Sequence, residues 1–219
     1  MASLRGGPGG PVTALRFTFV TDGASDRALL PVLTWLLRQH SQRPFQPQWA
    51  DLRYLRQPPR TLEDKIITAL ELYPCDLLFV HRDAERAPRE ARVAEIRRCL
   101  ADRAEPPTVC VIPVRMQEAW LLFDEAALRL AADNPHGTMA LSLPPLHRLE
   151  EIPDPKELLF KMLYSASGLR PGRLNRFHPS VRIHRLAELI EDFSPLRGLT
   201  AFQALEADLK ALVTEQRWA

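Results

Sequence analysis

The chain has 219 residues, of which 46% are hydrophobic and 26% are charged, and its formal net charge at pH 7 is +2. This composition is typical of a globular protein with a substantial core, and the small net charge gives no overall electrostatic preference for nucleic acid. The chain has no apolar run of the roughly 18 residues that a membrane-spanning helix needs. Its three widely spaced cysteines are typical of buried thiols in a reducing compartment, so we expect a cytoplasmic protein with no membrane partner.

Strand and helix patterns alternate through the first half of the chain. The glycine- and proline-rich residues 1–12 are expected to form a flexible tail. The patterns that follow predict strands over 15–21, 49–55, 76–81 and 108–114, and helices from 25 or 26 to 37, over 61–72 and over 88–103. This order predicts an α/β fold with a mostly parallel sheet flanked by helices.

The last third of the chain has a different character. Helix patterns over 118–128, 156–165, 183–192 and 200–213 are separated by a proline-rich loop region, and no comparable strand pattern appears. We therefore expect an α/β domain over 13–130 and an all-helical extension over 131–219 that packs on it.

Acidic residues follow two of the predicted strands. Asp83 and Glu85 come directly after the apolar strand at 76–81, and Asp22 follows the first strand. The carboxyl ends of parallel strands meet at one edge of a sheet, where ligands bind in open α/β folds. Carboxylate oxygens suit hard divalent cations, so these three residues are the predicted ligands of Mg²⁺ or Mn²⁺. The alternatives are a turn with a helix cap at Asp22 and Asp26, and a solvated turn at Asp83 and Glu85.

The strand followed by Asp22-Gly23-x-x-Asp26 and a helix, and the later strand followed by Asp83-x-Glu85, resemble the TOPRIM superfamily over roughly residues 14–115. That superfamily includes catalytic modules of primases and topoisomerases and nucleases of the overcoming-lysogenization-defect type. The resemblance implies a magnesium site and phosphoryl-transfer chemistry on nucleic acid. The chain departs from the family pattern, because Asp22 stands where the family has a glutamate and Glu85 where it has an aspartate. The shorter side chain at 22 affects proton transfer more than metal binding.

Two further segments carry candidate residues. After the fourth strand, Glu118 could act as a base or ligand and Arg115 could neutralise a phosphate, while the alternative for Glu118 is a favourable position at a helix N-terminus. A basic segment around Phe177 could follow a nucleic-acid backbone, and its alternative is an ordinary arginine-rich surface. Its arginines are Arg170, Arg173, Arg176, Arg182 and Arg185.

These observations predict a Mg²⁺- or Mn²⁺-dependent nuclease acting on DNA or RNA, within a defence or mobile-element system. Asp22, Glu118 and Arg115 are its predicted catalytic residues. The second hypothesis is a catalytically silent TOPRIM-like subunit that binds nucleic acid or a partner protein, and the third is an enzyme acting on a small phosphorylated molecule. The sequence leaves the oligomeric state open. The enzymatic hypothesis depends on Asp22, Asp83 and Glu85 meeting at one edge of the sheet.

Overall fold

A computed structural model describes residues 14–101 and 106–219, so the predicted tail at 1–12 lies outside the described residues. Its centre is a four-stranded parallel sheet with the strand order β2-β1-β3-β4. The strands are β1 (Leu15–Val20), β2 (Phe45–Trp49), β3 (Leu77–His81) and β4 (Thr108–Val111). The α/β class with a parallel sheet is therefore confirmed.

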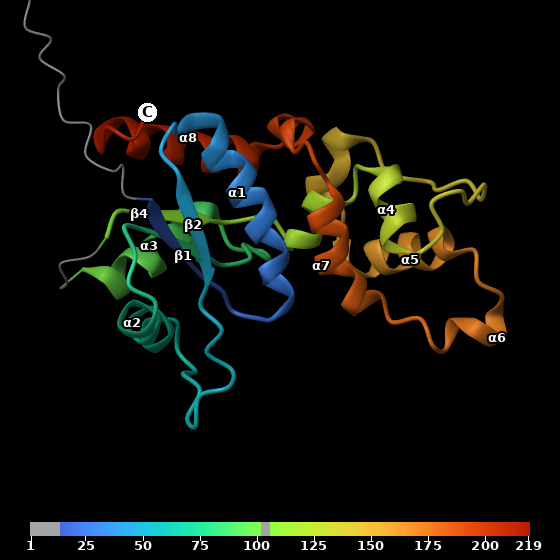
Figure 1. Cartoon of the computed structure of the whole chain (residues 1–219), viewed down its shortest axis with the longest axis horizontal. Helices are drawn as coiled ribbons and strands as arrows, with labels where there is room; N and C mark the ends of the chain where they lie inside the picture. Colours follow the sequence, from blue (N-terminus) through green and yellow to red (C-terminus); the bar gives the residue numbers. More distant parts are fainter. Residues whose placement is uncertain (1–13, 102–105) are drawn as a thin grey trace, which may run out of the picture.

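Helices cover both faces of the sheet (Figure 1). One face packs against α1 (Leu29–His40) and α8 (Thr200–Glu215), and the other packs against α2 (Leu62–Leu72) and α3 (Arg89–Leu100). Side chains of β3 alternate between the two cores: Phe79 faces α1 and α8, whereas Leu78 and Val80 face α2 and α3. Because both faces of the sheet are covered, β3 is buried along its whole length.

The remaining helices continue the fold beyond the carboxyl ends of the strands, on the right in Figure 1. Two short 3-10 helices follow strands directly, η1 (Ser25–Ala28) after β1 and η2 (Gln117–Leu121) after β4; η1 packs against α7 and η2 against α5. The other elements are α4 (Glu125–Ala131), η3 (Leu146–Glu151), α5 (Pro155–Ser167), α6 (Pro171–Leu174), α7 (Pro179–Leu189) and η4 (Ser194–Gly198). The described part of the chain contains no strand after β4, as predicted for the extension.

Three local predictions differ from the structure. The second strand lies at Phe45–Trp49 and not at 49–55, because an edge strand tolerates the exposed residues Gln46 and Pro47, which weaken its pattern. The helix predicted over 118–128 is divided into η2 and α4 at Asp124, whose side chain caps α4. The helix predicted from 25 or 26 begins there as the 3-10 helix η1, and α1 starts only at Leu29, which places Pro31 in its first turn.

Among the residues that the structure describes, no helix combines the length and the apolar character needed to cross a membrane.

Candidate functional site

The strand order places a topological switch point between β1 and β3. The chain connects β1 to its neighbour β2 on one side, and then crosses back to β3 on the other side. In open α/β sheets ligands bind in the crevice outside the carboxyl ends of the strands at such a point. Four polar residues, called here the acidic cluster, lie there: Asp26, His81, Asp83 and Glu118.

His81 is the centre of the acidic cluster. Its Nε2 atom lies 3.5 Å from Asp83 Oδ1 and 3.8 Å from Asp26 Oδ2, and the side chain is 1% exposed. Its Nδ1 atom lies 3.1 Å from the carbonyl oxygen of Val111, which accepts the proton of that nitrogen. The hydrogen bond orients the ring and directs Nε2 toward the two carboxylates.

Gln117 and Glu118 bring η2 into the cluster. The Gln117 side-chain amide donates a hydrogen bond to Asp26 Oδ1 at 3.1 Å, and the Gln117 backbone NH donates to Asp83 Oδ1 at 3.2 Å. Glu118 is buried, and Nζ of Lys156 in α5 lies 3.9 Å from its carboxylate. Gln117 Oε1 is also buried and has no hydrogen-bond partner among the described residues.

Burial changes the acidity of this cluster. It raises the pKa of Asp83 to about 6, an effect that His81 opposes and that Asp26 and Glu118 reinforce. Burial likewise raises the pKa of Glu118, against the effects of a backbone hydrogen bond and of Lys156. Carboxyl groups with such environments exchange protons closer to neutral pH than ordinary carboxyl groups do.

The raised pKa of Asp83 predicts a pH-dependent stability. In the folded state Asp83 has a pKa of about 6, whereas the pKa of an aspartate in the unfolded chain is near its ordinary value of 3.8. The stabilisation is therefore complete below about pH 4 and is lost as the pH rises through 6, a change of about 3 kcal/mol in the free energy of unfolding. In EDTA, Asp83→Asn should unfold at higher denaturant concentration than the wild type at pH 8, and both proteins should be similar at pH 4. Equal midpoints at pH 8 would contradict the burial of an ionised Asp83.

Asp22 lies in a different environment from the acidic cluster. Lys65 Nζ donates to Asp22 Oδ1 at 3.0 Å, and Arg82 forms a second ion pair with Asp22 Oδ2. Burial acts to raise the pKa of Asp22, but Lys65 and Arg82 outweigh it and hold the pKa below its usual value. The pairing follows from the register, because Val20 lies opposite Val80 and the residues two positions further are Asp22 and Arg82.

The side chain of Glu85 also lies outside the acidic cluster. It has a positive φ of 55°, its side chain is 70% exposed, and its carboxylate lies 3.5 Å from Arg92 Nη2. Glu95 connects Arg92 to Arg82, at 3.0 and 3.2 Å. The resulting chain of alternating charges, called here the charge network, is Lys65–Asp22–Arg82–Glu95–Arg92–Glu85.

The predicted ligand set is therefore not assembled: Asp22 and Glu85 belong to the charge network, and Asp83 belongs to the acidic cluster. Among residues 14–101 and 106–219, no three acidic, histidine or cysteine side chains are already placed to hold one metal ion. The structure instead adds Asp26, His81 and Gln117 to Asp83 and Glu118. Asp26 belongs to the Asp22-Gly23-x-x-Asp26 motif, so the sequence provided a reason to include it. No motif in the sequence indicated Gln117.

Arg115 and the basic segment complete the predicted site residues. Arg115 is half-buried, and its Nε has no hydrogen-bond partner in the described part of the chain. Arg173, Arg176 and Arg182 line a hollow of about 620 Å³ beside Phe177. Arg182 pairs with Asp133 at 2.7 Å, and Arg170 and Arg185 are exposed on the same part of the surface. The segment includes α6, which lies at the far end of the molecule from the sheet (Figure 1).

Comparisons of the chain with protein-family models, with curated proteins and with solved structures give no significant match. The fold and the site geometry described above therefore carry the functional argument.

Proposed function

We propose that the protein is a Mg²⁺- or Mn²⁺-dependent, TOPRIM-like enzyme that cleaves phosphodiester bonds in DNA or RNA. The observation that carries the proposal is the acidic cluster of Asp26, His81, Asp83 and Glu118 at the switch point of a parallel sheet. This cluster replaces the predicted ligand set of Asp22, Asp83 and Glu85.

The chemistry of the acidic cluster fits a hard divalent cation. Carboxylate oxygens are the ligands that Mg²⁺ and Mn²⁺ prefer, and Asp26, Asp83 and Glu118 provide them. Gln117 adds a buried amide oxygen that has no partner among the described residues. His81 uses Nδ1 for the Val111 carbonyl, an arrangement that metal-binding histidines share. Among the described residues these side chains are not arranged as a complete ligand set, so binding of an ion requires them to rearrange. A bound divalent ion would supply Lewis acidity toward a phosphate oxygen.

The residues of the chain account for the rest of the chemistry. Burial raises the pKa values of Asp83 and Glu118 in the metal-free protein, so whichever of the two does not hold the ion is suited to accept and return a proton. Lys156 and Arg115 are the neighbouring cations that could stabilise negative charge on a phosphate. Asp22, held by Lys65 and Arg82, instead fixes the loop after β1.

The arginine-lined hollow is the proposed nucleic-acid contact outside the centre. Arg173 and Arg176 are exposed and line it together, so they can meet phosphates without first breaking an internal pair. Each phosphate contact releases condensed counterions, which makes binding dependent on salt.

The double variant Arg173→Ala/Arg176→Ala is expected to weaken binding to oligonucleotides of different sequences by a similar factor. The slope of log affinity against log salt should become smaller by about 1 to 2. Titrations in EDTA at several salt concentrations measure both quantities. Arg98→Ala, an exposed arginine of α3, is the matched control. An unchanged slope in the double variant would remove these arginines from the interface.

The second candidate function is a catalytically silent binding subunit. Internal contacts of the acidic cluster favour it: Asp83 accepts a hydrogen bond from the Gln117 backbone, and Asp26 accepts one from the Gln117 side chain. These bonds satisfy part of the cluster without a metal, as in a purely structural polar network.

The experiment that tests the proposal is cleavage by the intact chain. Supercoiled plasmid, single-stranded DNA and single-stranded RNA are incubated with Mg²⁺, with Mn²⁺ or with EDTA. Cleavage that requires a divalent ion supports the proposal. Nucleic-acid binding without cleavage under every condition favours the silent subunit, and hydrolysis of p-nitrophenyl phosphate alone favours an enzyme for small phosphoesters.

A further inference from the structure

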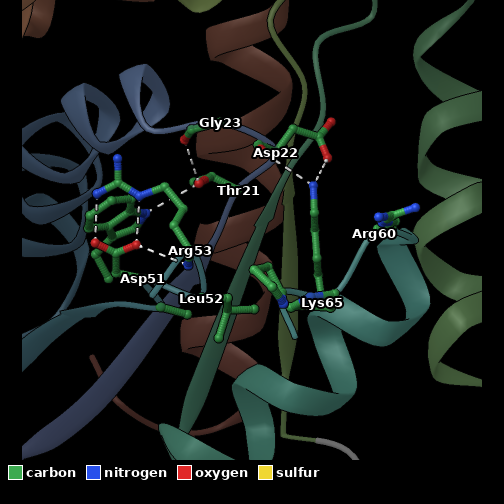
Figure 2. Close-up of a pocket in the computed structure, with 12 residues that line it drawn as sticks. Thr21, Asp22, Gly23, Asp51, Leu52, Arg53, Arg60 and Lys65 are labelled. Carbon is green, nitrogen blue, oxygen red and sulfur yellow. Dashed lines mark hydrogen bonds and ion pairs between the residues drawn. The ribbon is translucent and has the colours of Figure 1, made fainter. Parts of the chain in front are cut away.

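A second pocket lies at the carboxyl ends of β1 and β2 (Figure 2). Its volume is about 290 Å³, close to the lower limit of common small-molecule sites, about 300 Å³. The charge network borders it, because Asp22 and Lys65 both contribute to the lining. Gly23 also lines the pocket, and its backbone NH donates a hydrogen bond of 2.8 Å to Asp26 Oδ2 of the acidic cluster. A ligand in this pocket would therefore lie next to the proposed centre.

The lining of the pocket combines apolar surface with charges of both signs. Trp49, Leu52 and the two prolines at 58 and 59 provide the apolar part. The cations are Lys65, Arg53 and Arg60, which outnumber the two lining acids, Asp22 and Asp51. Figure 2 shows Arg53 on one side of the pocket and Lys65 with Arg60 on the other. This combination suits an organic ring that carries a phosphate.

On the side of the pocket formed by Arg53, the planar guanidinium group packs against two aromatic rings. The Arg53 guanidinium lies 5.0 Å from the centre of the Trp49 ring and 5.3 Å from that of Tyr54. Asp51 holds it with two hydrogen bonds of 2.7 Å, and Trp49 is anchored by a 3.2 Å bond from its Nε1 to Thr21. Tyr54 remains 85% exposed. Exposed aromatic rings beside arginines are the surfaces on which single-stranded bases stack.

We propose that this pocket binds one nucleotide of the strand on which the acidic cluster acts. The phosphate meets Lys65 and Arg60 in the pocket, and the base stacks on Tyr54, which lies outside the lining and next to the lining residue Arg53. That the ligand is part of a nucleic-acid strand rests on the proposed function. The pocket, the stacked aromatic and guanidinium groups and the excess of cations support the binding of a nucleotide at this place.

Binding in EDTA separates this assignment from catalysis. The probe is a fluorescent single-stranded oligonucleotide of about ten nucleotides, within the usual site size of such surfaces. Tyr54→Ala and Arg60→Ala should each raise Kd about tenfold, whereas Tyr54→Phe, which keeps the ring, should bind within about twofold of the wild type. Arg98→Ala is the matched control for loss of charge. Tyr54 and Arg60 are exposed, so these variants should keep the fold, which thermal unfolding verifies.

Oligonucleotide affinities equal to the wild type in both Tyr54→Ala and Arg60→Ala would overturn the assignment. The same conclusion would follow if adenosine monophosphate competed as well as unlabelled oligonucleotide, because the pocket would then take a free nucleotide. Metal-dependent cleavage by variants that bind normally would reject the pocket and leave the proposed function intact. Binding through Tyr54 without cleavage by the wild type would retain the pocket and reject the enzyme.

Discussion

Asp83→Asn and Asp26→Asn are each expected to lower metal-dependent cleavage of nucleic acid by at least about 100-fold, the usual scale for loss of a positioned proton-transfer or ligand group. Each substitution removes one negative charge from the acidic cluster while preserving the size of the side chain. In the Asp83→Asn variant the amide oxygen can still accept the hydrogen bond from the Gln117 backbone, so the fold should be retained. Initial rates of plasmid or oligonucleotide cleavage measure the effect.

Thermal unfolding with and without millimolar Mn²⁺ provides a second measurement for the same variants. The ion should raise the melting temperature of the wild type, because a ligand that binds only the folded state stabilises it. The shift should disappear in Asp83→Asn. Asp208→Asn, an exposed residue of α8 paired with Arg89, is the matched control for both measurements. Wild-type rates and an unchanged thermal shift in Asp83→Asn would refute the assignment of the acidic cluster as the metal site.

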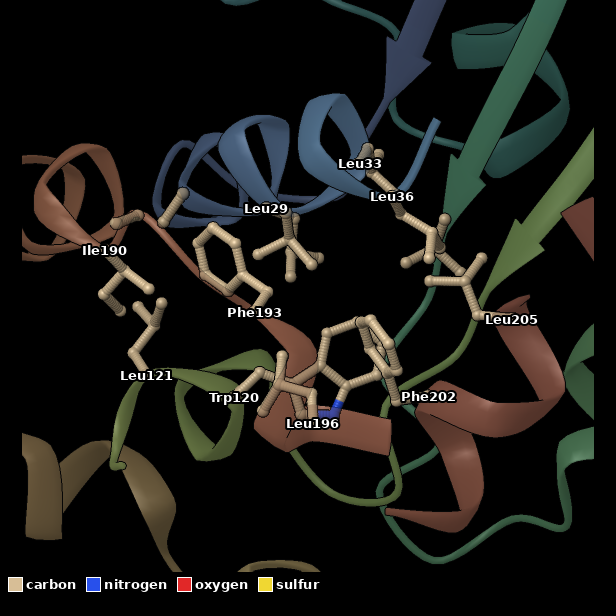
Figure 3. Packing of buried hydrophobic residues seen from close by; sticks show 14 of the residues in the cluster. Leu29, Leu33, Leu36, Trp120, Leu121, Ile190, Phe193, Leu196, Phe202 and Leu205 are labelled. Atoms are coloured by element: carbon tan, nitrogen blue, oxygen red, sulfur yellow. The ribbon is translucent and has the colours of Figure 1, made fainter. Parts of the chain in front are cut away.

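Trp120→Ala is expected to produce the largest loss of stability, about 3 to 5 kcal/mol. Trp120 is 1% exposed and belongs to the core between α1, η2 and α8 (Figure 3). Its ring meets Phe202 edge to face, with centroids 5.5 Å apart. Because Trp120 anchors η2, its removal should also displace Gln117 and Glu118. Denaturant unfolding measures the first effect, and loss of the Mn²⁺-induced thermal shift measures the second.

Trp120→Phe is the control for that prediction, since it keeps an aromatic ring and should lose much less stability. A free energy of unfolding for Trp120→Ala within about 1 kcal/mol of the wild type would show that the core can collapse around the missing ring.

Much of the fold could be predicted from local patterns, and the parts that failed have identifiable reasons. β1, β3 and β4 combine β-forming residues with apolar runs, and Thr61 caps α2 as its sequence position indicates. The position predicted for β2 was wrong because an edge strand buries few side chains, so its sequence shows only a weak pattern of apolar residues. The single helix predicted over 118–128 was wrong because Asp124 caps the start of α4, which separates α4 from η2.

The sequence predicted that Asp22, Asp83 and Glu85 meet at one edge of the sheet, whereas the structure divides them between the charge network and the acidic cluster. Asp22 and Asp83 both follow strand ends, but β3 is buried on both faces, so its sequence carries no alternation that distinguishes one face from the other. In the structure Asp22 shares the face of Val20 and Val80, whereas Asp83 continues the face of Phe79 and His81.

The sequence by itself therefore determined the α/β class, the strand ends that carry acids and the helical character of the last third. Local propensity and apolar periodicity are properties of short segments, and they can be read without knowing what packs on them. Only the tertiary structure decided which acids meet. The strand register pairs Asp22 with Arg82. The 3-10 helix η2, which begins 34 residues further along the chain, brings Gln117 and Glu118 to Asp83. Contacts between segments distant in the chain leave no periodic trace in either segment.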